Sequence, residues 1–189
     1  MKIVVLSDTH RAVHPALDAV LEQRPDAVIH LGDCVCDADD IAAAFPQLPL
    51  YSVAGNNDFG TSAPLCRVIE LSGARLYLTH GHMENVGQDL QRLYYKALEN
   101  DCIGALFGHT HRGVFTEIDG VYLMNPGSLS RPRDGSGGSF GIIETDDDQV
   151  CGKIYRYKEF TEGQAAGPSG GLRPKSGRLR RLLNDSDRL

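Results

Sequence analysis

The sequence has no long hydrophobic run and no excess of positive charge. The apolar run behind the N-terminus is only Ile3-Val4-Val5-Leu6, which is too short for a signal peptide or a membrane span. We therefore expect a cytoplasmic protein without a membrane segment. Lys and Arg total 19 against 25 Asp and Glu, which gives a formal net charge of -6. General nucleic-acid binding through a basic surface is therefore not expected.

The cysteines do not indicate a disulfide framework. The cysteines number 5, an odd count, and a chain of 189 residues is long enough to bury a core without disulfides. Cys34 and Cys36 form a C-x-C pair, whereas zinc knuckles and thioredoxin-type sites use C-x-x-C. We interpret the cysteines as unpaired thiols of a reducing compartment.

The first third of the chain alternates between strand and helix patterns. Residues 2–6 form an apolar run rich in β-branched side chains, which is typical of a strand buried on both faces. Apolar residues then recur with helical spacing over 13–21. Further strands are expected at 27–31 and 50–53, with a short helix at 41–45 between them. This order predicts parallel strands with right-handed crossovers.

The remainder combines hairpins with one strong helix pattern. Residues 68–79 are typical of a hairpin around Ser72-Gly73-Ala74, and the spacing of apolar residues over 86–98 predicts an amphipathic helix. Strands are then expected at 103–107, 114–118, 121–124, 139–144 and 150–157, with Asp119-Gly120 as a strong hairpin turn. The pattern predicts an α/β protein, a four-layer αββα sandwich of two mixed β-sheets flanked by helices.

The composition changes near the C-terminus. Residues 1–160 are predicted to form one domain, and residues 161–189 a flexible tail. Residues 163–177 are rich in Gly, Pro and Ser and have little to bury. Residues 176–189 place arginines around leucines, which fits either a short basic amphipathic helix or a solvated tail.

Side chains that can bind metals follow five of the expected strands, at the point where each strand ends. The candidate ligands are Asp8, His10, Asp33, Asn56, His80, His109 and His111. Ligand sites form at such strand ends in open α/β sheets. The mixed set of carboxylates, imidazoles and one amide suits Mn, Fe, Zn, Co or Ni better than Ca or Mg. Seven ligands are too many for one tetrahedral ion but suffice for two ions if one carboxylate bridges them.

These motifs resemble those of the calcineurin-like metallophosphoesterases. The family pattern is D-x-H, GD, GN[H/N/C][D/E], HG and GHxH. Here it is matched by Asp8-Thr9-His10, Gly32-Asp33, Gly55-Asn56-Asn57-Asp58, His80-Gly81 and Gly108-His109-Thr110-His111. The short spacings are most similar to the small bacterial and archaeal phosphodiesterases of the YfcE type, whose scaffold vacuolar sorting protein 29 shares. The resemblance covers roughly residues 1 to 158.

The resemblance implies a binuclear metal centre and a hydrolase activity. Asp8, His10, Asp33 and His111 would hold the first ion, and Asp33, Asn56, His80 and His109 the second, with Asp33 bridging. Mn is the expected ion, with Ni, Zn, Fe or Co as alternatives. A hydroxide bridging the two ions would attack phosphorus in line. The implied function is a metal-dependent phosphodiesterase acting on small phosphate esters.

One position departs from the family pattern. Many members carry His where this chain has Asn57, and an amide can donate a hydrogen bond but cannot deliver a proton. We predict Asn57 as a catalytic and substrate-binding residue, and a preference for diesters with good leaving groups. His82 is predicted either to supply the missing imidazole or to lie at the rim. Cys36, which closely follows Asp33, is predicted to line the pocket.

Two other functions fit the same residues. The chain could be a metal-binding scaffold for protein partners with little or no catalysis, or a phosphomonoesterase. A homodimer through exposed faces of the second sheet is a further hypothesis.

Overall fold

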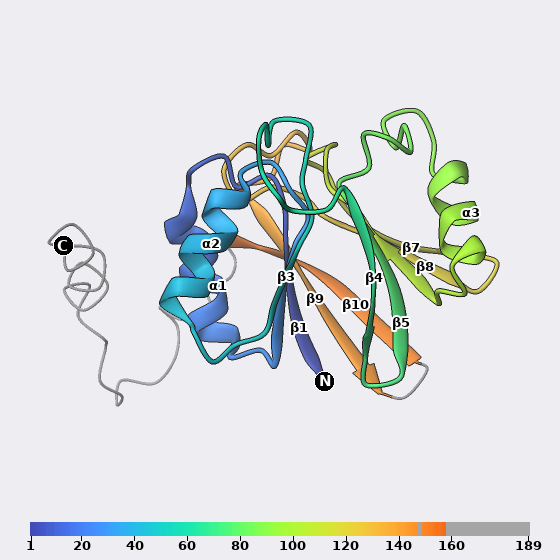
Figure 1. Cartoon of the computed structure of the whole chain (residues 1–189), viewed down its shortest axis with the longest axis horizontal. Coiled ribbons are helices and arrows are strands. Elements are labelled where there is room, and N and C mark those ends of the chain that lie inside the picture. The colour runs from blue at the N-terminus through green and yellow to red at the C-terminus, as the bar shows by residue number, and fades with distance from the viewer. Residues whose placement is uncertain (147–148, 158–189) are drawn as a thin grey trace, which may run out of the picture.

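The computed structural model describes residues 1–146 and 149–157, which Figure 1 shows in colour. The helices and strands of these residues are β1 (Lys2–Leu6), α1 (Val13–Gln23), β2 (Ala27–His30), α2 (Val35–Ala44), β3 (Leu50–Ser52), β4 (Cys66–Leu71), β5 (Ala74–Thr79), α3 (Gln91–Glu99), β6 (Gly104–Leu106), β7 (Gly113–Ile118), β8 (Val121–Pro126), β9 (Ser139–Asp146) and β10 (Gln149–Arg156). The predicted flexible tail and basic helix lie outside the described residues.

The strands form two five-stranded mixed sheets. The first has the order β10-β9-β1-β2-β3, with β1, β2 and β3 parallel and β9 antiparallel to β1. The second has the order β4-β5-β6-β8-β7, with β5, β6 and β8 parallel. Both the parallel start of the chain and the antiparallel hairpins that follow agree with the sequence prediction.

Alternate side chains of β1 face two different cores. Ile3 and Val5 point between the two sheets and pack in one cluster with Leu76 and Leu78 of the other sheet. Val4 and Leu6 point outward, into a second cluster that includes Leu17 and Val20 of α1 and Ile41 of α2. Because both faces of β1 are buried, its sequence is apolar throughout.

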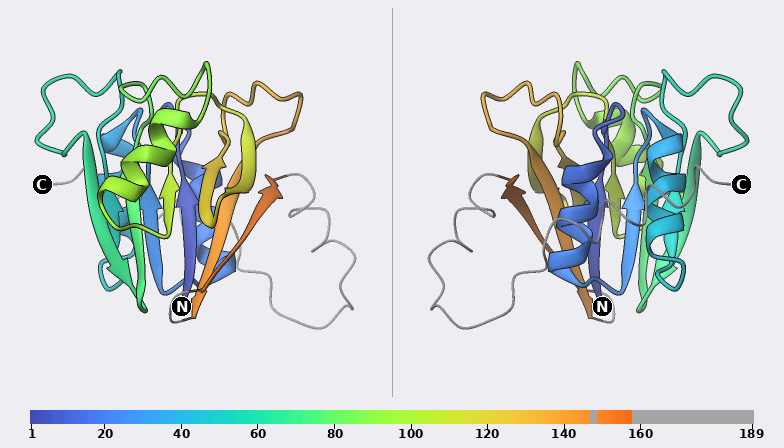
Figure 2. Two further views of the ribbon diagram at one scale, coloured as in Figure 1. Left: turned by 90° about the vertical axis from the view of Figure 1, so that its right-hand side faces the viewer. Right: turned by 90° about the vertical axis from the view of Figure 1, so that its left-hand side faces the viewer.

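Helix α3 covers the outer face of the second sheet. Leu93 and Ala97 pack there with Ala105 of β6 and Leu123 of β8. In Figure 2 the left view looks onto α3 and the right view onto α1 and α2, so the two sheets lie between helical layers. The four-layer αββα sandwich predicted from the sequence is therefore confirmed.

Two helices differ from their predicted bounds. Helix α2 begins at Val35, six residues before the predicted start, because a carboxylate from a distant loop caps its first turn, as described below. Helix α3 begins only at Gln91, although the apolar spacing starts at Val86. Val86 is buried without being helical, since its backbone N–H bonds to the carbonyl of Gly81 and its side chain packs over that glycine.

The carboxyl ends of the parallel strands lie together at one end of the sandwich. The N-terminus lies at the opposite end, and the long connecting loops gather at the top of Figure 1. Both sheets therefore contribute loops to one surface. Among the described residues, no helix has the length and apolar content needed to cross a bilayer.

Candidate metal centre

All seven predicted ligands lie on loops at this end of the sandwich. Asp8 and His10 follow β1, Asp33 follows β2 and Asn56 follows β3, all in the first sheet. The other three ligands, His80, His109 and His111, follow β5 and β6 of the second sheet. The centre therefore spans the junction of the two sheets, where residues far apart in sequence meet.

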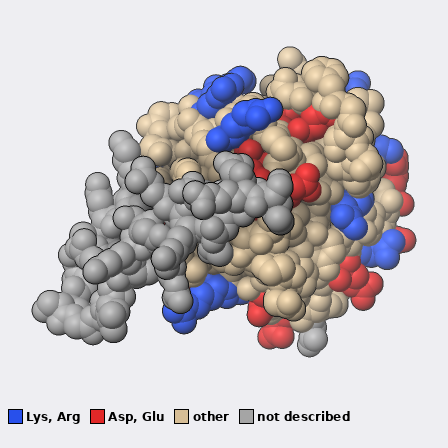
Figure 3. Space-filling view, turned by 60° about the vertical axis from the view of Figure 1, so that its left-hand side comes forward, with Lys and Arg blue, Asp and Glu red and all other residues tan. Residues whose placement is uncertain are grey.

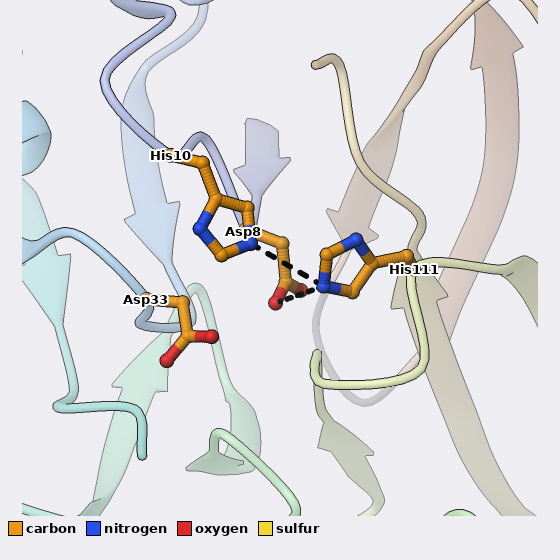
Figure 4. A group of neighbouring side chains, drawn as sticks. All are labelled: Asp8, His10, Asp33 and His111. Atoms are coloured by element: carbon orange, nitrogen blue, oxygen red, sulfur yellow. Dashed lines mark hydrogen bonds and ion pairs between the residues drawn. The ribbon is translucent and has the colours of Figure 1, made fainter. Parts of the chain in front are cut away.

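Four of the seven side chains form a tight group. The ligating atoms of Asp8, His10, Asp33 and His111 all lie within 4.8 Å of one another. Nε2 of His111 lies 3.1 Å from Oδ1 of Asp8 and 3.4 Å from Nε2 of His10. Figure 4 shows these side chains pointing toward a common centre.

The contact between Asp8 and His111 requires a proton or a metal ion between the two groups. Nδ1 of His111 lies 2.7 Å from the carbonyl oxygen of Arg131, which can only accept, so Nδ1 carries a proton. In the neutral ring, Nε2 is then a lone pair that faces a carboxylate oxygen. Oδ2 of Asp8 accepts from the Ser7 hydroxyl at 2.6 Å and from the backbone N–H of His109 at 3.0 Å, whereas Oδ1 is buried without a donor.

A proton on Nε2 satisfies this contact when no metal is bound. The hydrogen bond with Asp8 raises the pKa of His111, so the position between the two side chains favours a positive charge. Burial would raise the pKa of Asp8, but contacts with His111, His80 and Ser7 hold it below its usual value. A metal ion bound at this position would replace the proton.

Two of the remaining predicted ligands, His80 and His109, converge on the side-chain oxygen of the third, Asn56. Oδ1 of Asn56 lies 3.1 Å from Nε2 of His80 and 2.9 Å from Nδ1 of His109. Nδ1 of His80 donates to the carbonyl of Leu31 at 2.7 Å, which leaves Nε2 of His80 as the ligating atom. That Nε2 also lies 3.4 Å from Oδ1 of Asp33, so Asp33 contacts both groups of ligands.

The charge state of the centre favours divalent cations. Asp8 is fully buried and Asp33 is 2% exposed, and in the described part of the chain neither pairs with Lys or Arg. Two buried carboxylates without such partners are costly unless a cation compensates them. Burial lowers the pKa of His10 and of His109, which favours the neutral imidazole that metal binding requires.

The backbone is strained at most of these ligands. Asp8, His10, Asp33, His109 and His111 all have positive φ, between 46° and 68°. Each such residue costs on the order of 1–3 kcal/mol unless the surrounding structure compensates, and clusters of them mark functional sites. Gly108 adds a close approach, because a Cβ there would collide with the hydroxyl of Ser7 and the carboxylate of Asp8.

Asp58 holds the loop of Asp33, and the sequence analysis did not identify this role. Its carboxylate accepts four backbone N–H groups at 2.8 Å, from Asp33, Cys34, Val35 and Gly55. Partial burial would raise the pKa of Asp58, but these bonds lower it below the usual range. Asp58 is the last residue of the Gly-Asn-Asn-Asp motif, which is the signal in the sequence that points to it.

The end of β8 and the loop after it support the Gly-His-Thr-His motif and the Asp8 loop. Nδ2 of Asn125 donates to the carbonyl of Gly108 at 2.6 Å and contacts the Thr110 hydroxyl at 3.1 Å. The Ser128 hydroxyl donates to the carbonyl of Asp8 at 2.8 Å. Sequence reasoning missed this loop because it carries no metal ligand, although Asn125-Pro126-Gly127-Ser128 stands at another strand end.

His30 links two of the loops that carry candidate ligands. Its ring is fully buried, with Nε2 3.0 Å from the Thr9 hydroxyl and Nδ1 accepting the backbone N–H of Gly32 at 3.3 Å. It therefore ties together the loops that carry Asp8 and Asp33.

Asn57 contacts the carboxylate that both ligand groups share. Its backbone N–H donates to Oδ1 of Asp33 at 3.0 Å and its Nδ2 donates to Oδ2 at 2.5 Å.

The ring of His82 lies 5.5 Å from that of His80, with a buried Nδ1 that has no hydrogen-bond partner among the described residues. Cys36 is not among the residues that line the cavity over the centre, and its thiol lies 3.8 Å from the carboxylate of Asp37. A contact between Cys36 and substrate stays a prediction.

The chain matches known proteins over most of its described length. A sequence model of the calcineurin-like phosphoesterase superfamily domain matches residues 1–148. YsnB of Bacillus subtilis, a probable metallophosphoesterase, is 28% identical over 159 residues, which cover 82% of this chain and 90% of that protein. The phosphodiesterase YfcE of Escherichia coli K12 is 29% identical over 172 residues, 77% of this chain and 89% of YfcE.

Solved structures agree on the fold. A predicted phosphoesterase of Streptococcus pneumoniae superposes with a TM-score of 0.72 at 27% identity, covering 83% of this chain and 90% of that one. Vps29 of Entamoeba histolytica in complex with Zn²⁺ superposes with a TM-score of 0.67 at 22% identity, covering 83% of this chain and 99% of that one.

Proposed function

Because the chain belongs to the calcineurin-like phosphoesterase superfamily, we propose that it is a phosphodiesterase that uses two divalent metal ions. The observation that carries the proposal is the buried contact of 3.1 Å between Oδ1 of Asp8 and Nε2 of His111. The first ion would be held by Asp8, His10, Asp33 and His111, and the second by Asp33, Asn56, His80 and His109. Mn is the proposed ion, with Ni, Zn, Fe or Co as alternatives of the same ligand preference.

Two such ions would lower the pKa of a shared water to about 7 and so supply the hydroxide that attacks phosphorus. Hydrogen bonds within the chain orient the side chains that would hold the ions. The carbonyls of Leu31 and Arg131 orient His80 and His111, and Asn57 fixes both oxygens of Asp33. Such outer contacts orient the ligands of most metal sites.

Asn57 limits the proposed substrates. Its side chain lines the cavity and can donate a hydrogen bond, but it cannot protonate a departing alkoxide. We therefore expect small phosphodiesters with good leaving groups to react fastest. His82 is the proposed source of an imidazole near the second group of ligands, because its ring lies 6.3 Å from that of His109.

The test is metal removal and selective return. The chelated protein receives Mn²⁺, Ni²⁺, Zn²⁺ or Mg²⁺ singly and is assayed with bis(p-nitrophenyl) phosphate and p-nitrophenyl phosphate. Turnover of the diester with Mn²⁺ supports the proposal, and preference for the monoester would make the protein a phosphomonoesterase. Metal binding without turnover of either ester would instead support the scaffold that binds protein partners. Cytoplasmic location and a homodimer stay predictions.

A further inference from the structure

Two arginines that the metal centre does not use line the cavity above it. The cavity has a volume of about 380 Å³, and Arg131 and Arg133 share its wall with His10, Asn57 and His111. Within residues 1–146 and 149–157, neither guanidinium takes part in a salt bridge.

The carboxylate next to Arg133 in sequence is engaged elsewhere. Asp134 accepts the backbone N–H of Ser136 at 2.9 Å and that of Gly113 at 3.4 Å. Within the described residues Asp134 forms no ion pair with Arg133, so this neighbouring carboxylate does not neutralise the guanidinium. Figure 3 shows basic side chains at the upper edge of the molecule, the end where the loops gather in Figure 1.

The backbone of both arginines is fixed to a metal ligand. The N–H of Arg131 donates to the Ser128 hydroxyl at 2.9 Å, and the Arg131 carbonyl accepts Nδ1 of His111 at 2.7 Å. The N–H of Arg133 donates to the carbonyl of His111 at 3.0 Å. Pro132 between them restricts the backbone further. The two side chains therefore start from anchored positions beside the centre.

A charge count indicates that these arginines serve a group other than the scissile phosphate. Two divalent ions carry four positive charges, and the carboxylates of Asp8 and Asp33 offset two of them. A hydroxide and the single negative charge of a phosphodiester offset the other two. Arg131 and Arg133 then add two positive charges to a cavity whose wall holds one carboxylate, Asp33, which the ions already use.

We propose that Arg131 and Arg133 form a subsite for a second anionic group of the substrate, a phosphate monoester beside the scissile diester. A guanidinium binds phosphate oxygens with two parallel hydrogen bonds. The two negative charges of a phosphate monoester would balance the charges of two guanidinium groups. The inference rests on the proposed phosphodiesterase function and narrows its substrates to diesters that carry an additional phosphate.

The kinetic test uses two substrates that differ by one phosphate. These are thymidine 5′-(p-nitrophenyl phosphate) and the same compound phosphorylated on the 3′ oxygen. The metal-loaded wild type should prefer the 3′-phosphorylated compound in kcat/KM by about tenfold or more, mainly through KM, as expected for charge-assisted hydrogen bonds. Arg131→Gln and Arg133→Gln should each reduce this preference, and Arg→Lys should restore part of it.

Arg112→Gln is the matched control. Arg112 directly follows His111 and is exposed, but it does not line the cavity. Its removal deletes the same charge from the neighbouring loop between β6 and β7 and should leave the preference unchanged. An equal loss in Arg112→Gln would mean that only long-range attraction is at work and would overturn the subsite.

Calorimetry gives a readout that does not depend on turnover. Thymidine 3′,5′-bisphosphate should bind the metal-loaded wild type about tenfold more tightly than thymidine 5′-monophosphate, and the double variant R131Q/R133Q should lose that advantage. Equal affinities in the wild type, or an advantage that survives in the double variant, would refute the subsite. If the wild type hydrolyses the plain diester without any preference, the subsite is wrong and the proposed function stands. If it hydrolyses neither compound, the proposed function fails, while calorimetry still decides the subsite.

Discussion

Oδ1 of Asp8 lies 3.1 Å from Nε2 of His111, and Nδ1 of the same ring donates its proton to the carbonyl of Arg131. Two ligands about 2.1 Å from one ion and at about a right angle to each other are about 3 Å apart. The separation is thus the one that a shared metal ion needs. The fold produces it by joining a loop of the first sheet to a loop of the second.

Replacing Asn57 with His tests the role of the missing acid. The imidazolium of Asn57→His could protonate a departing alkoxide, so hydrolysis of diesters with alkyl leaving groups should rise by about a hundredfold relative to aryl diesters. The measurement is the dependence of kcat/KM on the pKa of the leaving group. Asn57→Gln is the control, since it keeps an amide and should not flatten that dependence. Equal effects on alkyl and aryl esters would contradict this role.

Asp58→Asn tests the support of the Asp33 loop. The amide retains one acceptor oxygen where the carboxylate accepts four N–H groups, so the free energy of unfolding should fall by about 2–3 kcal/mol. Affinity for metal should fall as well, because Asp33 loses its fixed position. Urea unfolding and metal titration measure the two effects. Asp119→Asn is the control at an exposed hairpin turn, where Asn tolerates the positive φ of 46°.

A chain ending at residue 160 tests the predicted domain boundary. Every described helix and strand precedes this point, and the Tyr157 hydroxyl already anchors the end of the sheet by donating to Asp18 at 3.0 Å. The shortened chain should keep the melting temperature and metal content of the full chain. A chain ending at residue 148 lacks β10, which pairs with β9 along its whole length, and should be markedly less stable. A large loss of stability in the first chain would place part of the fold beyond residue 160.

The sequence predicted the layers correctly and selected seven candidate ligands that the fold brings to one end of the sandwich, because both depend on local patterns. Apolar runs marked the strands, and a ligand placed directly after a strand needs no knowledge of tertiary structure. Helix α2 was predicted too short because its cap, Asp58, comes from 23 residues beyond Val35. Helix α3 was predicted too long because Val86 satisfies its hydrophobic spacing by packing over Gly81.

The supporting residues of the centre could not be found in the same way. Asp58, Asn125 and Ser128 act through backbone N–H and carbonyl groups, which leave no signature in the side-chain pattern. Arg131 and Arg133 also follow a strand end, but arginine is not a metal ligand, so the ligand pattern does not include them. Their position beside the centre follows from the tertiary contacts between the loop after β8 and His111.

The central claim is that one carboxylate, Asp33, serves two metal ions. The most direct measurement is the metal content per chain of purified wild type and Asp33→Ala after saturation with Mn²⁺ and removal of free metal, together with diester turnover. His14→Ala, on the exposed face of α1, is the control. The wild type and His14→Ala should bind two ions and be active, and Asp33→Ala should lose both ions and turnover while keeping its far-UV circular dichroism. An Asp33→Ala protein that still binds two ions, or that keeps full turnover at matched metal, would contradict the two-metal centre.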